Sequence, residues 1–490
     1  MTHRFARVVA VIAATTGTAC LAQVAEPAQK VAAAPAKSSP AAAVSAEELG
    51  ALKAQLQALQ ERLAQLEAAQ AEQRTAQETV NTELQESVDR GSDNLARAVG
   101  ESASSGWLAR WQWKGDLRVR NETIQQEFNP VDRNRNRYRL RAGAMARVND
   151  NTRVEIQFAS GEGGDARSSN QTMTDANARK ALDLDLAYVE WSPTDTWKVT
   201  AGKMKYPWVR VQSYFFDNDV NPEGVAAAWQ QGATGFFGSV FYAGLSERSS
   251  FADSSMIGAQ AGWRAASSDG SRKLLALSYY DHGAVQGYNP FQGAGAGASG
   301  LGAYGNTTTT NAAVCRRAVY SSAGVVSPCL ANDYDIVELL GEYQFNLGPQ
   351  PMLVFGNVAR NLKADSGVVS TTPSSNVPAG LDTAYSVGFN YGRANANLPG
   401  SWEVGYLYQR VEKDALFAQW IDSDFAAGNT DGGGSAFRVA YQLSRNWRFN
   451  VLYMMNKTNL DVPAAVTVPA GASAKGRGYD RLQVDLNWTY

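Results

Sequence analysis

Histidine is almost absent from the chain, which contains two among its 490 residues. His3 lies in the N-terminal segment, so a Ser/His/acid hydrolase would have to use His282, with Ser278 four residues before it. No HExxH motif or zinc-ligand spacing occurs, and the glycines between Gly293 and Gly305 precede no predicted helix, unlike a phosphate-binding loop. The sequence therefore predicts no enzyme, no cofactor and no metal site, with a hydrolase that uses His282 as the alternative.

Net charge and long apolar runs are also lacking. The formal charge is −2, which argues against binding to nucleic acid. No run of about twenty apolar residues follows the N-terminus, which excludes a membrane-spanning helix. The mean hydropathy of −0.31 is typical of soluble proteins, but membrane β-strands hide their apolar face in alternation and escape this average.

The first 22 residues have the pattern of a secretory signal peptide. His3, Arg4 and Arg7 form a basic start, residues 8–19 are apolar, and Cys20-Leu21-Ala22 ends in a small residue suited to cleavage. Lipidation of Cys20 is the alternative. A signal peptide predicts that the mature protein lies beyond the inner membrane.

Residues 23–106 divide into three segments. Residues 23–44 are rich in Ala and Pro and predict a flexible linker, and residues 91–106 form a second polar linker. Residues 45–90 predict a coiled coil, because leucines recur at alternate spacings of three and four. A single helix lying on another surface is the alternative. The seam consists of Leu49, Leu52, Leu56, Leu59, Leu63 and Leu66.

Cysteine is scarce, with three in the chain. Cys20 falls in the predicted signal peptide, and Cys315 and Cys329 share one loop rich in Gly, Ser and Thr. In an oxidising compartment this pair predicts a disulfide. Two free thiols are the alternative.

From Trp111 onward the apolar residues alternate with polar ones, as in β-strands that have one apolar face. In residues 111–120 and 137–148 the opposite face carries arginines. Similar segments recur to the C-terminus and, with four further segments at 182–191, 225–229, 235–244 and 351–360 whose facing stays open, predict about sixteen strands. They begin near residues 111, 137, 154, 182, 197, 225, 235, 257, 275, 337, 351, 385, 402, 437, 447 and 482.

The connections between these segments alternate between short and long. Short turns lie near residues 149–151, 192–195, 346–350 and 444–446. The connections that alternate with them are long loops, the longest of which is 282–333. Short turns at one end, long loops at the other and an aromatic C-terminus (Trp488-Thr489-Tyr490) are typical of outer-membrane barrels. Residues 107–490 therefore predict an antiparallel transmembrane β-barrel of about 16 strands, preceded by the α-helical coiled coil, with a soluble β-sandwich as the alternative.

A barrel of this size should enclose an aqueous channel. We therefore expect function to reside in interior side chains and in a long loop around residues 206–224, whose acids would face a basic wall and narrow the channel. The acids Asp116, Glu122 and Glu155 could instead neutralise the basic residues as a structural ladder. A Ca²⁺ site at Asp217 and Asp219 is a further alternative, although the glycine and distal glutamate of a calcium loop are lacking. The predicted pore-lining residues are Lys114, Arg118, Arg120, Arg137, Arg139, Arg141, Lys203, Lys205, Asp217, Asp219 and Glu223.

Several of these motifs resemble a known family. WKGDLRVRNE (113–122), RNRNRYRLR (133–141), AGKMKYP (201–207) and DNDVNPEGVA (217–226) are similar to the bacterial putative-porin family. The resemblance implies an outer-membrane porin that lets small hydrophilic solutes or ions diffuse passively, with outer-membrane lipid as its surroundings. A looser resemblance to trimeric porins, together with the coiled coil, favours a homotrimer. The coiled coil would lie in the periplasm and could contact the cell wall, so a structural tether is the alternative function.

Overall fold

The structure is a computed structural model that describes residues 110–161, 165–249, 251–289, 302–311, 313–315, 328–364, 377–464, 468–469 and 471–490. The predicted signal peptide, the two linkers and the coiled coil with its leucine seam lie outside these residues. Among the described residues, no helix combines the length and the apolar character needed to cross a membrane.

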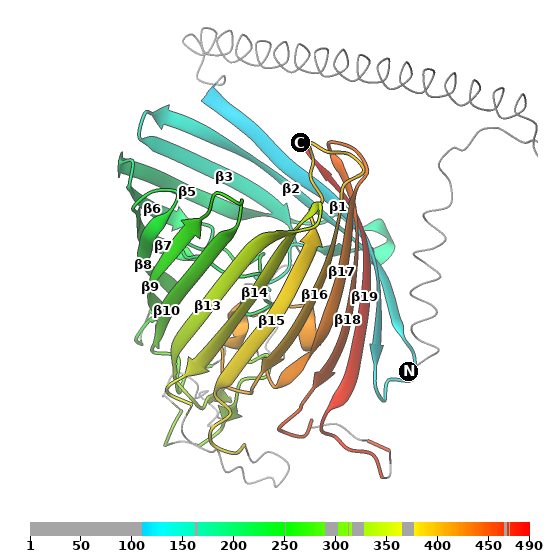
Figure 1. The fold of residues 1–490 in the computed structure, drawn as a ribbon. Helices are drawn as coiled ribbons and strands as arrows, with labels where there is room; N and C mark the ends of the chain where they lie inside the picture. Colours follow the sequence, from blue (N-terminus) through cyan, green and yellow to red (C-terminus); the bar gives the residue numbers. More distant parts are fainter. Residues whose placement is uncertain are drawn as a thin grey trace, which may run out of the picture. The chain divides into compact units, whose positions relative to one another are not determined.

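Sixteen antiparallel strands form a closed barrel in the described part of the chain, which confirms the predicted barrel (Figure 1). Each strand pairs with the next one along the chain, and β19 closes the barrel against β1, from Asp116 opposite Thr489 to Gln126 opposite Tyr479. The strands are β1 (Trp111–Gln126), β2 (Arg133–Asn149), β3 (Thr152–Ser160), β5 (Leu182–Thr194), β6 (Trp197–Lys203), β7 (Glu223–Gln230), β8 (Gly235–Ser246), β9 (Ser254–Ala266), β10 (Arg272–Gly283), β13 (Tyr334–Leu347), β14 (Gln350–Asn361), β15 (Thr383–Gly392), β16 (Trp402–Val411), β17 (Gly432–Gln442), β18 (Trp447–Thr458) and β19 (Arg477–Thr489).

The remaining short elements lie in the connections. β4 (Gln171–Thr172) pairs with β2 beyond the end of β3, and β11 (Thr308–Thr309) pairs with β12 (Cys329–Leu330) in a separate two-stranded sheet. Three short 3₁₀ turns complete the described elements: η2 (Asp175–Asn177), η5 (Ala418–Trp420) and η6 (Phe425–Gly428).

The strands turn their apolar face outward. In β1, Trp113 and Val119 are exposed on the outside, whereas Arg120 and Glu122, which follow on the opposite face, are buried inside. Apolar residues at alternate positions of the other strands are likewise exposed, including Ile257, Leu275, Leu339, Val387 and Leu486. This arrangement provides an apolar exterior for lipid and a polar wall for the interior.

Connection length separates the two ends of the barrel. The turns at residues 150–151, 195–196 and 348–349 lie at the end where β1 begins and β19 finishes, which is the upper end in Figure 1. The longer connections lie at the opposite end, as the sequence predicted. Segment 393–401 is an exception, because it is a nine-residue connection at the turn end.

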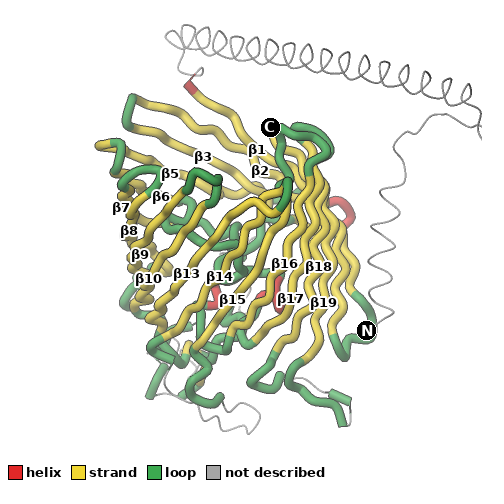
Figure 2. The backbone as a smooth tube through the Cα atoms, viewed as in Figure 1, coloured by secondary structure: helices red, strands yellow, loops and turns green. Residues whose placement is uncertain are grey.

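The expectation of an aqueous interior is wrong for about half of the barrel. Two long loops fold inward: L3, residues 204–222, and L7, residues 412–431. Figure 2 shows the short turns of L7 within the ring of strands. Apolar side chains of both loops pack against the inner faces of β8–β10 and β13–β18 and fill that half. Burial of apolar surface explains why these loops leave the solvent.

Candidate functional site

L3 crosses the interior because inward-facing amides of the opposite wall hold its backbone. Gln260 of β9 accepts a hydrogen bond from the N–H of Val209 and donates one to its carbonyl oxygen, both at 2.8 Å. Further round the wall, the side chain of Gln409 accepts from the N–H of Tyr214 at 2.9 Å. These bonds satisfy buried backbone groups that have no strand partner.

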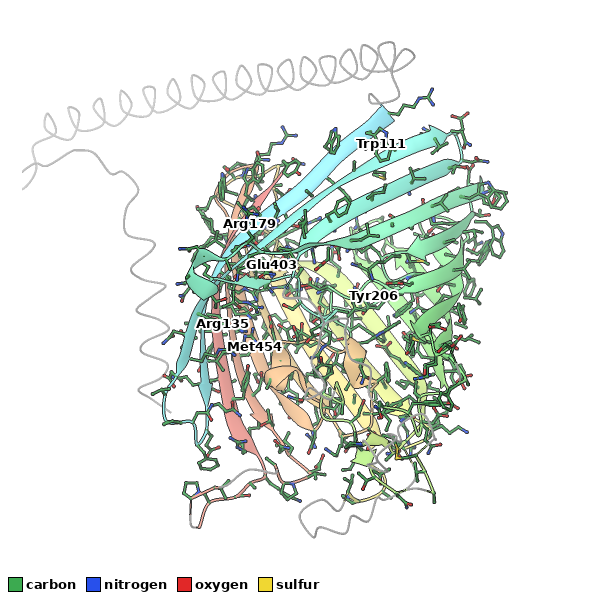
Figure 3. The ribbon with its side chains drawn as sticks, turned by 180° about the vertical axis from the view of Figure 1, so that it is seen from behind. Trp111, Arg135, Arg179, Tyr206, Glu403 and Met454 are labelled. Atoms are coloured by element: carbon green, nitrogen blue, oxygen red, sulfur yellow. A yellow bond between two sulfur atoms is a disulfide. The ribbon has the colours of Figure 1, made fainter. Side chains whose placement is uncertain are left out.

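L7 packs directly on L3. The N–H of Asp217 donates to the carbonyl oxygen of Trp420 at 2.7 Å, and the N–H of Ser423 donates to the carboxylate of Asp217 at 2.9 Å. The Trp208 ring of L3 stacks on Phe241 of the wall, with centroids 4.3 Å apart, and lies parallel to Trp420 of L7 at 6.2 Å. In Figure 3, Tyr206 of L3 marks this cluster within the barrel. The two loops form one plug, which we call the L3–L7 plug.

Arg167 fastens the plug to L2, the loop at residues 161–181. Its guanidinium donates to the carbonyl oxygen of Gly428 at 2.8 Å and pairs with Asp165 at 3.0 Å. The same group lies 3.3 Å from the ring centroid of Tyr304, which comes from the loop between β10 and β13. Three long loops therefore meet at one buried cation.

Inside the barrel, the basic residues of β1 and β2 lie beside acids. Arg120 makes a two-point contact with Asp485, at 2.7 and 2.8 Å, and Arg139 contacts Asp116 at 2.6 Å. Glu122 is fully buried and contacts Arg481 at 2.6 Å. These contacts agree with the alternative of a structural ladder neutralised by interior acids.

The other ladder residues contact the inward loops. Arg118 and Arg137 bind Asn170 of L2, through its side-chain and backbone oxygens respectively. Arg141 of β2 pairs with Asp219 of L3 at 2.5 Å. L3 is therefore also bound to the wall on the side of β2, opposite the packed half. Lys114 forms an ion pair with Glu155, whose other oxygen accepts from Tyr188 at 2.6 Å.

Two cavities lie in the half that the plug leaves unfilled. One, of about 960 Å³, lies toward the turn end and is lined by β5–β9 and the underside of L3, including Lys205. The other, of about 300 Å³, lies toward the loop end between L2 and L3 and includes Asp219. Asn221 separates them: its amide donates to Asp185 at 2.6 Å and its oxygen accepts from Lys205 at 3.1 Å. Asn221 and its two partners therefore form a polar layer between the residues that line the two cavities.

The strand register contradicts the prediction that Glu223 lines the interior. Glu223 begins β7 and lies on the same face as Val225, whose side chain is exposed on the outside. It pairs at 2.8 Å with Lys203, which lies opposite it on β6. The Nζ of Lys203 also donates to the carbonyl oxygen of Asn221 at 3.3 Å, and this lysine lines the smaller cavity.

The buried acids of the plug fall into two kinds. Burial would raise the pKa of Asp219, but Arg141 and Arg139 outweigh burial and lower this pKa to about 2. Burial, with Asp422 and Asp219 nearby, raises the pKa of Asp217 well above its usual value. Burial and the adjacent Asp424 likewise raise the pKa of Asp422 to about 7. Asp217 therefore favours the neutral form, Asp422 changes its charge near neutral pH, and Asp219 stays ionised.

Asp217 and Asp219 do not converge on a common point, because one accepts from backbone N–H groups and the other pairs with Arg141. No group of three metal-ligating side chains is found among the described residues. His282 is buried in the wall, where its Nδ1 lies 2.9 Å from the carbonyl oxygen of Tyr334 and its ring packs on Phe417. The Ser278 hydroxyl accepts from Gln260 instead.

Cys315 and Cys329 are joined as a disulfide in the structure, with their Cα atoms 5.7 Å apart. Cys329 belongs to β12, and the next residue, Leu330, is fully buried. The bond thus ties the loop between β10 and β13 to its own two-stranded sheet.

Sequence reasoning missed the L7 half of the plug and the interior amides that hold L3. The available signal was apolar clustering inside long loops: Tyr214-Phe215-Phe216 in L3, and the run Ala415 to Ile421, which contains Trp420, in L7. Such clusters are unusual in loops that face water. Gln260 and Gln409 gave a weaker signal, because a glutamine on the polar face of a strand is equally suited to a water-filled wall.

Solved structures of bacterial proteins are similar to this chain at low sequence identity. An OprB structure from Pseudomonas putida is 10% identical, with a TM-score of 0.48, covering 78% of this chain and 94% of that one. A loop-deleted OmpT from Vibrio cholerae is 13% identical (TM-score 0.40; 78% and 99%), and a Rhodopseudomonas blastica porin mutant is 12% identical (0.40; 78% and 100%). No curated protein matches the sequence.

The family model described as "Putative porin" matches residues 125–488, which covers nearly the whole barrel. This match spans more than half of the chain and agrees with the closed sixteen-stranded fold. The chain belongs to the putative porin family of outer-membrane barrels.

Proposed function

We propose that this barrel is a passive diffusion channel for small hydrophilic solutes or ions in the outer membrane. The observation that carries the proposal is the division of the interior. The L3–L7 plug closes one half, while the other half contains the cavities of about 960 and 300 Å³ on either side of Asn221. A path along β2–β6 would pass this polar layer, where Lys205, Asp185 and Arg141 surround the solute.

The ladder arginines act mainly as structure in this proposal. They hold L2 and L3 against β1 and β2 through ion pairs such as Arg141 with Asp219. We infer that the wall is rigid on this side, so that the width of the path is set by the position of L3. The hydrolase alternative has no support from His282, whose ring is enclosed by Tyr334 and Phe417.

We further propose that the long loops face outward from the cell and the turns face the periplasm, as in other barrels of this kind. The coiled coil at residues 45–90 would then lie in the periplasm, because β1 begins at the turn end. Its leucine seam supports a homotrimer, and it could also contact the cell wall.

A planar-bilayer recording with the purified full chain tests the channel. We expect stepwise conductance increments, with closures in groups of three for a trimer. A correctly folded barrel that never conducts would overturn the channel and favour a structural role, because the L3–L7 plug would then close the whole interior.

A further inference from the structure

Three ion pairs on the unfilled side of the interior share one orientation, with the cation toward the water and the acid behind it. On β3, the Arg153 side chain is 47% exposed, while its partner Glu190 is 10% exposed. Lys198 of β6 is also 47% exposed and contacts the same Glu190 at 3.1 Å. Lys114 is 37% exposed, against 7% for its partner Glu155.

The acids behind these cations have their oxygens occupied. Glu190 accepts from Arg153 at 3.0 Å and pairs with Lys198 through its other oxygen. Glu155 accepts from Lys114 through one oxygen and from Tyr188 through the other. At these three pairs a solute therefore meets N–H donors of cations first, and carboxylate oxygens only behind them. The smaller cavity beyond Asn221 differs, because Asp183, Asp185 and Asp219 line it directly.

Lys205 extends this surface to the polar layer at Asn221. Its side chain is exposed to the larger cavity, and its Nζ contacts the amide oxygen of Asn221 rather than a carboxylate. A third cavity, of about 430 Å³, adjoins the largest one and shares Glu190 and Lys198 with it. In the described residues, six basic side chains and three acidic ones line the two together. The six are Arg110, Arg147, Arg153, Lys198, Lys205 and Arg264.

We propose that this path selects small anionic solutes, and that Lys205, Lys114, Arg153 and Lys198 are the residues that determine the selectivity. The inference rests on the proposed channel function and names its solute class. The physical reason is distance, because a cation that borders the path lies close to a passing solute and interacts with it strongly. The ladder arginines are buried and paired with acids, so the net electrostatic potential that they add to the path is small. Charge-assisted N–H donors also suit carboxylate and phosphate oxygens.

Lys205→Gln is the sharpest test, because this lysine has an amide partner and its removal leaves no carboxylate unpaired. The measurement is the reversal potential of the full chain in a planar bilayer under a KCl gradient, repeated with potassium acetate. We expect the parent channel to prefer the anion in both salts. Lys205→Gln should lower the anion-to-cation permeability ratio about two- to fivefold, and Lys205→Glu should reverse the preference.

The double variant Arg153→Gln with Lys198→Gln tests the cations near the turn end separately. It should lower the anion-to-cation permeability ratio, because Glu190 is then left without its two cations. Arg360→Gln is the matched control, since this arginine lies on the same face as the outward Val358 and pairs with Asp382. It should leave the ratio unchanged. Absent conductance in the parent would overturn the channel itself. A conducting parent that prefers cations, or a ratio unmoved by Lys205→Gln and Lys205→Glu, would overturn only the anion selectivity.

Discussion

The N–H of Asp217 donates to the carbonyl oxygen of Trp420 at 2.7 Å, and this bond joins two loops that are about 200 residues apart in the sequence. The bond lies between aromatic rings of both loops, with Trp208 parallel to Trp420. The interior of the barrel is therefore set by loop-to-loop packing as much as by the wall.

Replacing Trp420 with Ala should loosen the L3–L7 plug. The substitution removes a buried ring from the aromatic cluster, and core changes of this kind cost about 3–5 kcal/mol. We expect larger and noisier single-channel conductance in a planar bilayer, with the barrel still folded. Trp447→Ala is the control, because this tryptophan lies on the outer face. Equal conductance for both variants would show that the plug does not border the path.

The plug should weaken as the pH rises. Burial, with Asp422 and Asp219, raises the pKa of Asp217, and burial, with Asp424, raises the pKa of Asp422 to about 7. Groups with a raised pKa bind protons more tightly in the packed state. The stabilisation from Asp422 is therefore complete below about pH 4 and is lost as the pH rises through about 7. Asp219, with a pKa of about 2, does not titrate in this window.

We therefore expect the current noise of the open channel, recorded in a planar bilayer, to increase between about pH 5 and about pH 8. Asp422→Asn should flatten this dependence, since the amide stays neutral. The outcome that contradicts the account is noise that decreases with rising pH, or an unchanged profile in Asp422→Asn.

Arg141→Gln should destabilise the contact between β2 and L3. The change leaves Asp219 without its closest cation. Breaking a largely buried ion pair lowers the free energy of unfolding by about 3 kcal/mol. We expect a lower unfolding temperature in detergent. The double variant Arg141→Gln with Asp219→Asn should recover most of the loss, because neither charge is then left alone. A double variant as unstable as the single one would mean that the pair has another role.

Reducing the bond between Cys315 and Cys329 should release the loop between β10 and β13. Closing a loop of 14 residues restrains the unfolded chain by about 3 kcal/mol. We expect faster proteolysis of this loop, with an intact barrel, after treatment with a thiol reductant. Thiols that titrate freely in the protein isolated from the outer membrane would contradict the disulfide.

Deleting residues 47–89 should leave a folded barrel and weaken the oligomer, because the leucine seam would be lost. Gel mobility without heating and cross-linking measure the effect. A trimer that is equally stable without this segment would exclude the coiled coil as its cause.

The sequence by itself determined the wall of the barrel. A residue in a strand faces inward or outward according to parity, so alternation such as that of Leu275 and Leu277 with Ala276 and Ser278 predicted the facing of most strands. The recurrence of such segments predicted their approximate number, but four segments without clear alternation left their facing open. The start of β7 was predicted two residues too late, which left Glu223 in the loop and led to the wrong expectation that it faces the interior. When a strand boundary is misplaced by two residues, the terminal residue is treated as part of a loop, and the parity that sets its facing is not applied to it.

Only the tertiary structure decided what fills the barrel. The ladder arginines are predictable as interior residues, but their roles depend on partners distant in sequence, such as Asp485 for Arg120 and Asp219 for Arg141. The inward fold of L7 depends on apolar contacts with L3 and with strands on the far wall. Local periodicity carries no information about such contacts, because their energy arises only when the closed barrel brings the distant segments together.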